Sequence, residues 1–334
     1  MTIAPGAYLR AYLEPLRPWL EADDVTDILI NAPDEVFVER ITGRMERIDA
    51  PGLDEVSLRR LAAQIAAQAH QGVSRETPLL SATLPGGERV QVIAPPATRG
   101  PMAMAIRKHV VSDLGLDDYV REGAFDGAVR SSLEEMRAAD AQLQAMLDAG
   151  DVAGFLRGAV ACRKNVLISG GTSTGKTTFL NALIKEIPSR ERLIVIEDAP
   201  EVRLDRPNAV GLIAVRGDQG EARVTAEDLL RATLRMRPDR IILGELRGGE
   251  AFSFLRAVNS GHPGSFTTVH ADTPDAAIEQ IALMVVQAGG GLKRADVLDY
   301  VRGSVEVAVQ LGRTTSGRGV REVRFSPRSY RRAD

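Results

Sequence analysis

Residues 165–180 combine glycine, lysine and hydroxyl side chains at a spacing that suits the binding of a phosphate chain. The segment reads NVLISGGTSTGKTTFL, and its loop follows the pattern G-x-x-x-x-G-K-[ST]. Glycine lets the backbone curl around an anion because it has no Cβ and tolerates positive φ. The loop N–H groups and the helix N-terminus then surround the phosphate. The pattern predicts nucleotide binding; the alternative is a glycine-rich turn that binds nothing.

Each position of this loop has an expected task. Lys176 reaches the β- and γ-phosphates, and the Thr177 hydroxyl holds Mg²⁺. ATP and Mg²⁺ are therefore the expected ligands. The residues expected to bind the phosphates are Gly170, Gly171, Thr172, Ser173, Thr174, Gly175, Lys176, Thr177 and Thr178.

Two further segments place carboxylates at the ends of apolar strands. Glu197 and Asp198 follow the run 193–196, where a carboxylate can orient or deprotonate the attacking water. Glu245 follows the run 241–244, where an acid can hold Mg²⁺ through a water molecule. We predict Glu197 and Glu245 as catalytic groups, although acidic strand ends are also common on surfaces.

Histidines flank the segment 266–269. The chain has four histidines, and His262 and His270 lie within nine residues of one another. A histidine-based metal site has little support, because no cysteine or third histidine is near in the sequence. A neutral imidazole that donates to the phosphates, or that senses the state of the site, fits better. We therefore predict a role for His270 and, less firmly, for His262.

The transition state of phosphoryl transfer needs cations beyond the lysine. Arg89 and Arg107 lie in expected strands of the N-terminal part, and both could reach phosphates if that part folds over the nucleotide. A single subunit offers few cations to the γ-phosphate, so we expect a ring of subunits. Further arginines cluster around the strand of Glu245, and the sequence does not choose among them: Arg235, Arg237, Arg240 and Arg247.

Composition limits the possible functions. The 334 residues are 44% apolar, carry a formal net charge of -3 and contain one cysteine, Cys162. This balance argues against a dominant nucleic-acid-binding surface, and we expect no sequence-specific nucleic-acid binding. One cysteine excludes an internal disulfide and a cysteine-rich zinc site. No signal peptide or spanning segment is evident, so a cytoplasmic protein is expected, with peripheral membrane attachment open.

The chain divides into three expected parts. Residues 1–111 read as a small α+β domain with an amphipathic helix at 54–69 and a hairpin at 79–93. Residues 112–151 carry ten acidic and three basic residues and read as a linker with one amphipathic helix. That helix is either part of a solvated connector or a docking element.

Residues 152–334 alternate strands and helices, which predicts an α/β domain with a mainly parallel sheet. Phosphate-binding loops lie at the carboxyl ends of such strands. The segment 313–334 carries seven arginines and two acids, and we interpret it as a solvated end. The expected strands are 165–169, 193–197, 211–215, 240–243 and 265–269, and the expected helices are 176–187, 225–236, 250–260 and 274–287.

These motifs together resemble those of the secretion traffic ATPases, with the greatest similarity to the type IV secretion and conjugation ATPases of the VirB11 type. The resemblance covers almost the whole chain, including DILIN, ERVQV and AIRKH in the N-terminal part. The four motifs that carry it are GGTSTGKTT, IEDAPE, RPDRIILGELRGGEA and GHPGSFTTVHAD.

The resemblance implies a RecA-like P-loop domain and a homohexameric ring of two tiers that hydrolyses ATP to power translocation or pilus assembly. It implies phosphate contacts from Arg89 and Arg107, a catalytic role for Glu197, a Mg²⁺-water role for Glu245 and the box histidine at His270. It also implies partners in a type IV secretion apparatus at the inner membrane. The long linker leaves open which subunit's N-terminal domain covers which nucleotide.

Three other functions stay open from the sequence. The first is a motor of type IV pili or type II secretion, although many type II motors carry a four-cysteine insert that this chain cannot form. The second is a nucleotide-dependent scaffold with little turnover. The third is a small-molecule kinase, which would need an acceptor substrate before it consumed ATP.

Overall fold

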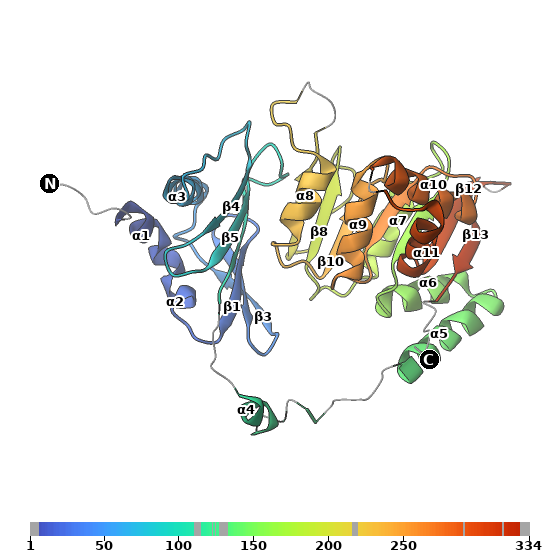
Figure 1. Cartoon of the computed structure of the whole chain (residues 1–334), viewed down its shortest axis with the longest axis horizontal. Coiled ribbons are helices and arrows are strands. Elements are labelled where there is room, and N and C mark those ends of the chain that lie inside the picture. The colour runs from blue at the N-terminus through green and yellow to red at the C-terminus, as the bar shows by residue number, and fades with distance from the viewer. Residues whose placement is uncertain are drawn as a thin grey trace.

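A computed structural model describes residues 7–109, 115–121, 123, 125–126, 133–215, 220–289, 291–315 and 317–327. Its two folded bodies lie side by side (Figure 1). No helix in these described ranges is both long enough and apolar enough to cross a bilayer. The first body contains α1 (Ala7–Leu13), η1 (Glu14–Leu16), α2 (Arg17–Leu20), β1 (Val25–Ile30), β2 (Glu35–Arg40), β3 (Met45–Asp49), α3 (Glu55–Gln68), β4 (Leu79–Thr83), β5 (Arg89–Ile93) and β6 (Ala103–Arg107).

The first body is a six-stranded antiparallel sheet in the order β3-β2-β1-β6-β5-β4. Successive side chains of a strand face opposite sides, and along the inner strand β1 both sides are buried. Ile28 and Ile30 pack with α1 and α3, whereas Leu29 packs with residues of the second body. The expected helix 54–69 is α3, which begins after Asp54, whose side chain accepts a hydrogen bond from Ser57 N at 2.6 Å.

The connecting segment contains α4 (Leu116–Arg121) and α5 (Leu133–Asp148). The helix α5 packs against α6 (Val152–Ala161) through Leu143, which is buried in the core of the second body. Asp140 of α5 also forms an ion pair of 2.6 Å with Lys164. The amphipathic helix of the linker is therefore a docked element in this structure. Ser131 and Glu134 could form a capping box at the start of this helix, but Ser131 lies outside the described residues.

The second body is a seven-stranded sheet in the order β13-β12-β7-β11-β10-β8-β9, with helices on both faces (Figure 1). All neighbouring strands are parallel except β12 and β13. The central strands are buried throughout, as expected for a sheet covered on both faces. Its other elements are β7 (Val166–Ser169), α7 (Lys176–Lys185), β8 (Leu193–Glu197), β9 (Ala209–Ile213), α8 (Ala226–Thr233), β10 (Arg240–Leu243), α9 (Glu250–Asn259), β11 (Phe266–Val269), α10 (Pro274–Gln287), α11 (Arg294–Ser304), β12 (Val307–Thr314) and β13 (Gly317–Phe325).

The interpretation of 313–334 as a solvated end is wrong for the residues that the structure describes. The strand β13 pairs with β12 along its whole length. The arginines of GRGVREVRF recur every third residue, and the pairing register shifts at Gln310/Leu311. The segment therefore lacks the two-residue alternation that marks a regular strand in a sequence.

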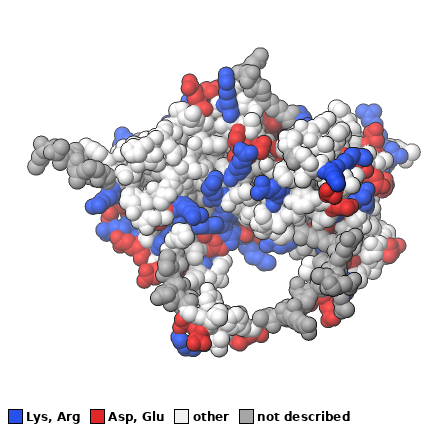
Figure 2. Space-filling view, in the orientation of Figure 1, with Lys and Arg blue, Asp and Glu red and all other residues white. Residues whose placement is uncertain are grey.

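The two bodies share an interface at the outer strand β9. Thr98 forms an isolated bridge with Leu212, and Arg99 N donates to Gly211 O at 2.9 Å. Arg237 pairs with Glu39 across the same interface. Figure 2 shows lysine and arginine side chains gathered along this junction.

Candidate active site

The loop after β7 has the backbone shape that a phosphate cradle requires. Gly175 adopts a φ of 91° and Ser173 a φ of 61°. A Cβ at Gly170 would lie 2.9 Å from Leu311 O, so glycine is needed there for a close backbone approach. The loop ends at the N-terminus of α7, where backbone N–H groups and the helix dipole favour an anion. This confirms the expected strand–loop–helix arrangement of the pattern.

Lys176 lies over the loop. Its Nζ donates to Gly170 O at 2.8 Å and to Gly171 O at 3.1 Å, and it lies 3.4 Å from His270 Nδ1. Burial lowers the pKa of Lys176, and Arg247 adds to this effect while Glu245 opposes it. The ammonium is thus held at the mouth of the loop, within reach of an anion bound there.

An open cavity of about 630 Å³ lies beside the loop. It brings together residues from the ends of β7, β8, β10 and β11, since the carboxyl ends of parallel strands meet at one edge of a sheet. All its lining residues belong to the second body: Thr172, Ser173, Thr174, Gly175, Lys176, Thr177, Thr178, Glu197, Asp198, Ala199, Glu201, Val202, Gly244, Glu245, Arg247, Thr268, His270 and Arg318.

Glu197 ends β8 and is buried at the cavity wall. Its Oε1 accepts hydrogen bonds from Glu201 N at 3.1 Å and Val202 N at 2.8 Å. Its other oxygen, Oε2, forms an ion pair with Arg99 of the first body. The carboxylate is therefore fixed in orientation beside the loop, as a water-orienting group must be.

Glu245 is held by a guanidinium and an imidazole. It pairs with Arg247, and its Oε1 lies 2.8 Å from His270 Nε2. The side chain of Arg247 keeps its charge, because the hydrogen bond to Glu245 raises the pKa of Arg247 more than burial lowers it. The structure thus joins three motifs at one place: the loop through Lys176, the second acidic segment and the histidine segment.

The donor set of the cavity suits Mg²⁺. Thr177 Oγ1 donates to Glu201 Oε2 at 2.9 Å, and carboxylates of Glu197, Asp198 and Glu245 line the same space. Hydroxyl and carboxylate oxygens are the ligands that Mg²⁺ prefers. The residues present therefore fit the ion that the loop pattern predicts.

Sequence reasoning missed Glu201 and Arg318 as lining residues, and it left Arg247 as one of four arginines among which it could not choose. Glu201 and Arg247 each lie within a motif already recognised, four residues after Glu197 and two after Glu245, so local spacing was a usable signal. Arg318 comes from the edge strand β13, and its Cδ would lie 3.7 Å from a Cβ at Gly175. No local signal identifies it, because only the pairing of β13 brings it to the loop.

Arg89, Arg107 and His262 are not brought to this cavity within one chain. Arg89 and Arg107 face one another in the register of β5 and β6, and Arg107 Nε donates to Asp27 Oδ1 at 2.9 Å. His262 precedes β11 and so lies at the amino end of that strand, opposite the loop, whereas His270 follows it. His262 Nδ1 lies 3.0 Å from Pro238 O, and burial lowers its pKa.

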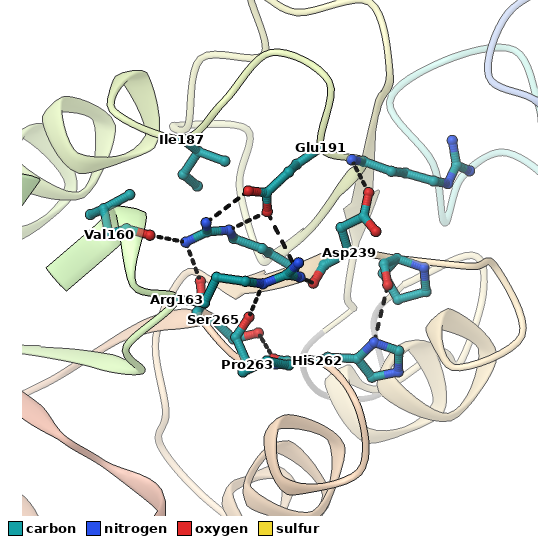
Figure 3. A network of polar contacts seen from close by, with 12 residues as sticks. Val160, Arg163, Ile187, Glu191, Asp239, His262, Pro263 and Ser265 are labelled. Atoms are coloured by element: carbon teal, nitrogen blue, oxygen red, sulfur yellow. Dashed lines mark hydrogen bonds and ion pairs between the residues drawn. The ribbon is translucent and has the colours of Figure 1, made fainter. Parts of the chain in front are cut away.

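His262 belongs to a buried polar network at the amino ends of the strands (Figure 3). The fully buried Arg240 makes two hydrogen bonds to Glu191, at 2.6 and 2.9 Å. Arg163 donates to Asp239 O at 2.7 Å and lies 3.8 Å from Glu191. Buried charges of this kind are paired and hydrogen-bonded, which is a structural arrangement.

The amino-acid sequence matches one family model over residues 11–316. Its description is Type II/IV secretion system protein. This range includes most of the first body, the connecting segment and every lining residue of the cavity except Arg318.

Curated relatives match over most of their own length. The type IV secretion system protein VirB11 of Bartonella henselae is 40% identical, covering 94% of this chain and 92% of that protein. The VirB11 of Brucella suis is also 40% identical, covering 98% of this chain and 92% of that protein. The PtlH homolog of Bordetella bronchiseptica is 41% identical, covering 83% of this chain and 81% of that protein.

A solved structure has the same architecture. The VirB11 ATPase from the Brucella suis type IV secretion system, crystallised in complex with sulphate, superposes with a TM-score of 0.88 at 38% identity. The match covers 97% of this chain and 96% of that chain.

Proposed function

Because the chain belongs to the type II/IV secretion system protein family and is a type IV secretion ATPase similar to VirB11, we propose that the cavity beside the Gly170–Thr178 loop is where it hydrolyses ATP. The observation that carries this proposal is the convergence of Lys176, Glu197, Glu245 and His270 on one cavity. These side chains come from four separate segments, and the sheet topology brings them together at one edge.

In this proposal each side chain has a defined task. The loop N–H groups and Lys176 bind the β- and γ-phosphates. Glu197, fixed by two backbone N–H groups, accepts a hydrogen bond from the attacking water and orients it in line with the γ-phosphate. His270 lies between Lys176 and Glu245 and holds these two side chains in place beside the phosphates.

Thr177 would hold Mg²⁺ directly, and Glu245 would hold it through a water molecule. Glu201 would keep accepting the hydrogen bond that the Thr177 hydroxyl donates to it in this structure. When bound, Mg²⁺ supplies positive charge at the β- and γ-phosphate oxygens.

We further propose a homohexamer in which the cavity of one subunit receives Arg89 and Arg107 from a first body other than the one docked here on β9. Two observations support it. Both arginines lie away from the cavity of their own chain, and the cavity has an open side. The long segment between the bodies gives the first body reach. The domain boundaries 1–111, 112–151 and 152–334 belong to this proposal.

The proposed setting is the cytoplasmic side of the inner membrane, with peripheral attachment and other components of a type IV secretion apparatus as partners. The similarity to VirB11 and PtlH supports this setting more than a type II or pilus motor. ATP turnover by the purified chain without an acceptor would separate it from a kinase.

The test is the mass of the assembly, measured by light scattering with and without Mg-ATP, beside the rate of phosphate release. We expect a mass of six subunits and steady phosphate release. A monomer at micromolar protein concentration with Mg-ATP would contradict the ring. Mixing inactive Lys176→Ala subunits with inactive Arg107→Ala subunits should restore some turnover only if the two residues act across subunits.

A further inference from the structure

One residue of the first body reaches the catalytic carboxylate of the second. We propose that Arg99 is a positioning residue for Glu197, so that the rate of hydrolysis depends on the docking of a first body against β9. This inference deepens the proposed function and rests on it, because it assigns Arg99 an effect on a residue assigned there to the attacking water.

The backbone of the segment 97–99 is fixed to β9. Arg99 N donates to Gly211 O and Ile213 N donates to Ala97 O, both at 2.9 Å, while Thr98 forms a bridge with Leu212. The segment therefore behaves as a short additional strand at the edge of the second sheet. Its position is set by backbone hydrogen bonds and does not depend on the ion pair.

The side chain of Arg99 then crosses β9 to reach Glu197. It passes directly over Gly211, where an added Cβ would lie 2.5 Å from Arg99 Cδ and 2.9 Å from Arg99 Nε. On the far side Nη1 donates to Val202 O at 2.7 Å, and Nη2 pairs with Glu197 Oε2. Gly211 thus leaves a passage that any larger residue would obstruct.

Arg99 and two backbone N–H groups together hold both oxygens of Glu197. Oε1 accepts from Glu201 N and Val202 N, and Oε2 faces the guanidinium. The side chains of Arg99 and Glu197 are only 19% and 4% exposed, so little water can replace the arginine. Loss of the guanidinium would leave a buried carboxylate with an unpaired oxygen and freedom to rotate.

The arginine does not line the cavity, so its effect is on the orientation and charge environment of Glu197 and not on ATP. Misplacement of a reacting group by about 1 Å can cost roughly 100-fold in rate. We therefore expect Arg99 to affect kcat and to leave nucleotide affinity nearly unchanged. Because Arg99 belongs to the first body, any movement of that body away from β9 would withdraw the guanidinium from Glu197.

The competing explanation is that Arg99 only holds the two bodies together. The chain offers a matched control in Arg237, which pairs with Glu39 across the same interface and is 22% exposed, but does not contact Glu197. A second control is the exposed pair of Arg75 and Glu221, which also joins the two bodies.

The experiment compares Arg99→Gln, Arg99→Lys and Arg237→Gln in the full chain, with Arg75→Gln as the control if Arg237→Gln does not fold. The measurements are kcat and KM for ATP, the Kd of a fluorescent ATP analogue and the melting temperature. We expect Arg99→Gln to lower kcat by about 10- to 100-fold with Kd changed less than about twofold. Arg99→Lys should recover part of kcat, because it restores a cation.

The control should keep kcat within about threefold of the unsubstituted protein, whatever its melting temperature. Equal losses of kcat in Arg99→Gln and the control would overturn the proposal, and so would an unchanged kcat in Arg99→Gln. Failure of the proposed function would give a different result, because Lys176→Ala would then hydrolyse ATP as fast as the unsubstituted chain does. That result would remove the basis of this inference as well.

Discussion

His270 Nε2 lies 2.8 Å from Glu245 Oε1, while His270 Nδ1 lies 3.4 Å from Lys176 Nζ. One imidazole therefore links the lysine of the phosphate loop to the carboxylate that follows β10. We predict that His270→Ala lowers kcat by about 10- to 100-fold, because Lys176 and Glu245 lose the group that spaces them. Steady-state phosphate release would show it, and His262→Ala is the matched control because it lies at the opposite edge of the sheet. Equal losses in both would contradict this role.

Arg318 contributes a cation to the cavity from the edge strand β13. We predict that Arg318→Gln weakens ATP binding by about 1 to 3 kcal/mol, as expected when one charged partner of a phosphate is lost. A fluorescent ATP analogue measures the change. Arg321→Gln, on the same strand but not in the lining, should bind as the unsubstituted chain does. Unchanged affinity in Arg318→Gln would rule out a phosphate contact.

Lys164 joins the linker helix to the second body. Its Nζ lies 2.6 Å from Asp140 Oδ1 and 3.1 Å from Glu306 Oε1. Burial lowers the pKa of Lys164, but these two carboxylates outweigh burial and raise it overall. Lys164→Met removes this ammonium from two buried carboxylates, so we expect a loss of about 3 to 5 kcal/mol in the free energy of unfolding. Urea unfolding measures it, with the exposed Lys185→Met as control. A loss below about 1 kcal/mol in Lys164→Met would show that α5 does not depend on this contact.

His262 gives the fold a defined pH dependence. Burial lowers its folded pKa, with Arg163 and Arg107 acting in the same direction against Asp239 and the Pro238 carbonyl. The unfolded chain then binds more protons than the fold below about pH 6.5, so stability falls as the pH falls through that value. We predict that His262→Gln shows a smaller loss of melting temperature between about pH 7.5 and about pH 5.5. A larger loss of melting temperature in His262→Gln than in the unsubstituted chain would contradict this prediction.

The sequence predicted the parts of the site that depend on local order. The loop, Glu197, Glu245 and His270 each follow an apolar strand, and parallel strands end at the same edge, so their convergence follows from the pattern. His262 precedes its strand and lies at the other edge by the same rule. The confirmed strands and helices differ from the expected ones by a few residues at their ends, as at β9 (Ala209–Ile213).

What the sequence could not predict depends on contacts between distant segments. The strand β13 was hidden by its arginines, and so Arg318 was missed. Arg99 lies in a loop with no motif, and its importance comes only from the docking of the segment 97–99 on β9. Arg89 and Arg107 lie in β5 and β6 of the first body and do not line the cavity of their own chain, a separation that their strand patterns did not reveal.

The central claim is that Glu197 activates water for the hydrolysis of ATP held by the Gly170–Thr178 loop. The most direct test measures ATP binding and phosphate release side by side in Glu197→Gln and Lys176→Ala. We predict that Glu197→Gln binds ATP with nearly unchanged affinity and loses at least about 100-fold in phosphate release. Lys176→Ala should lose turnover. Phosphate release by Glu197→Gln at the rate of the unsubstituted chain would contradict the claim.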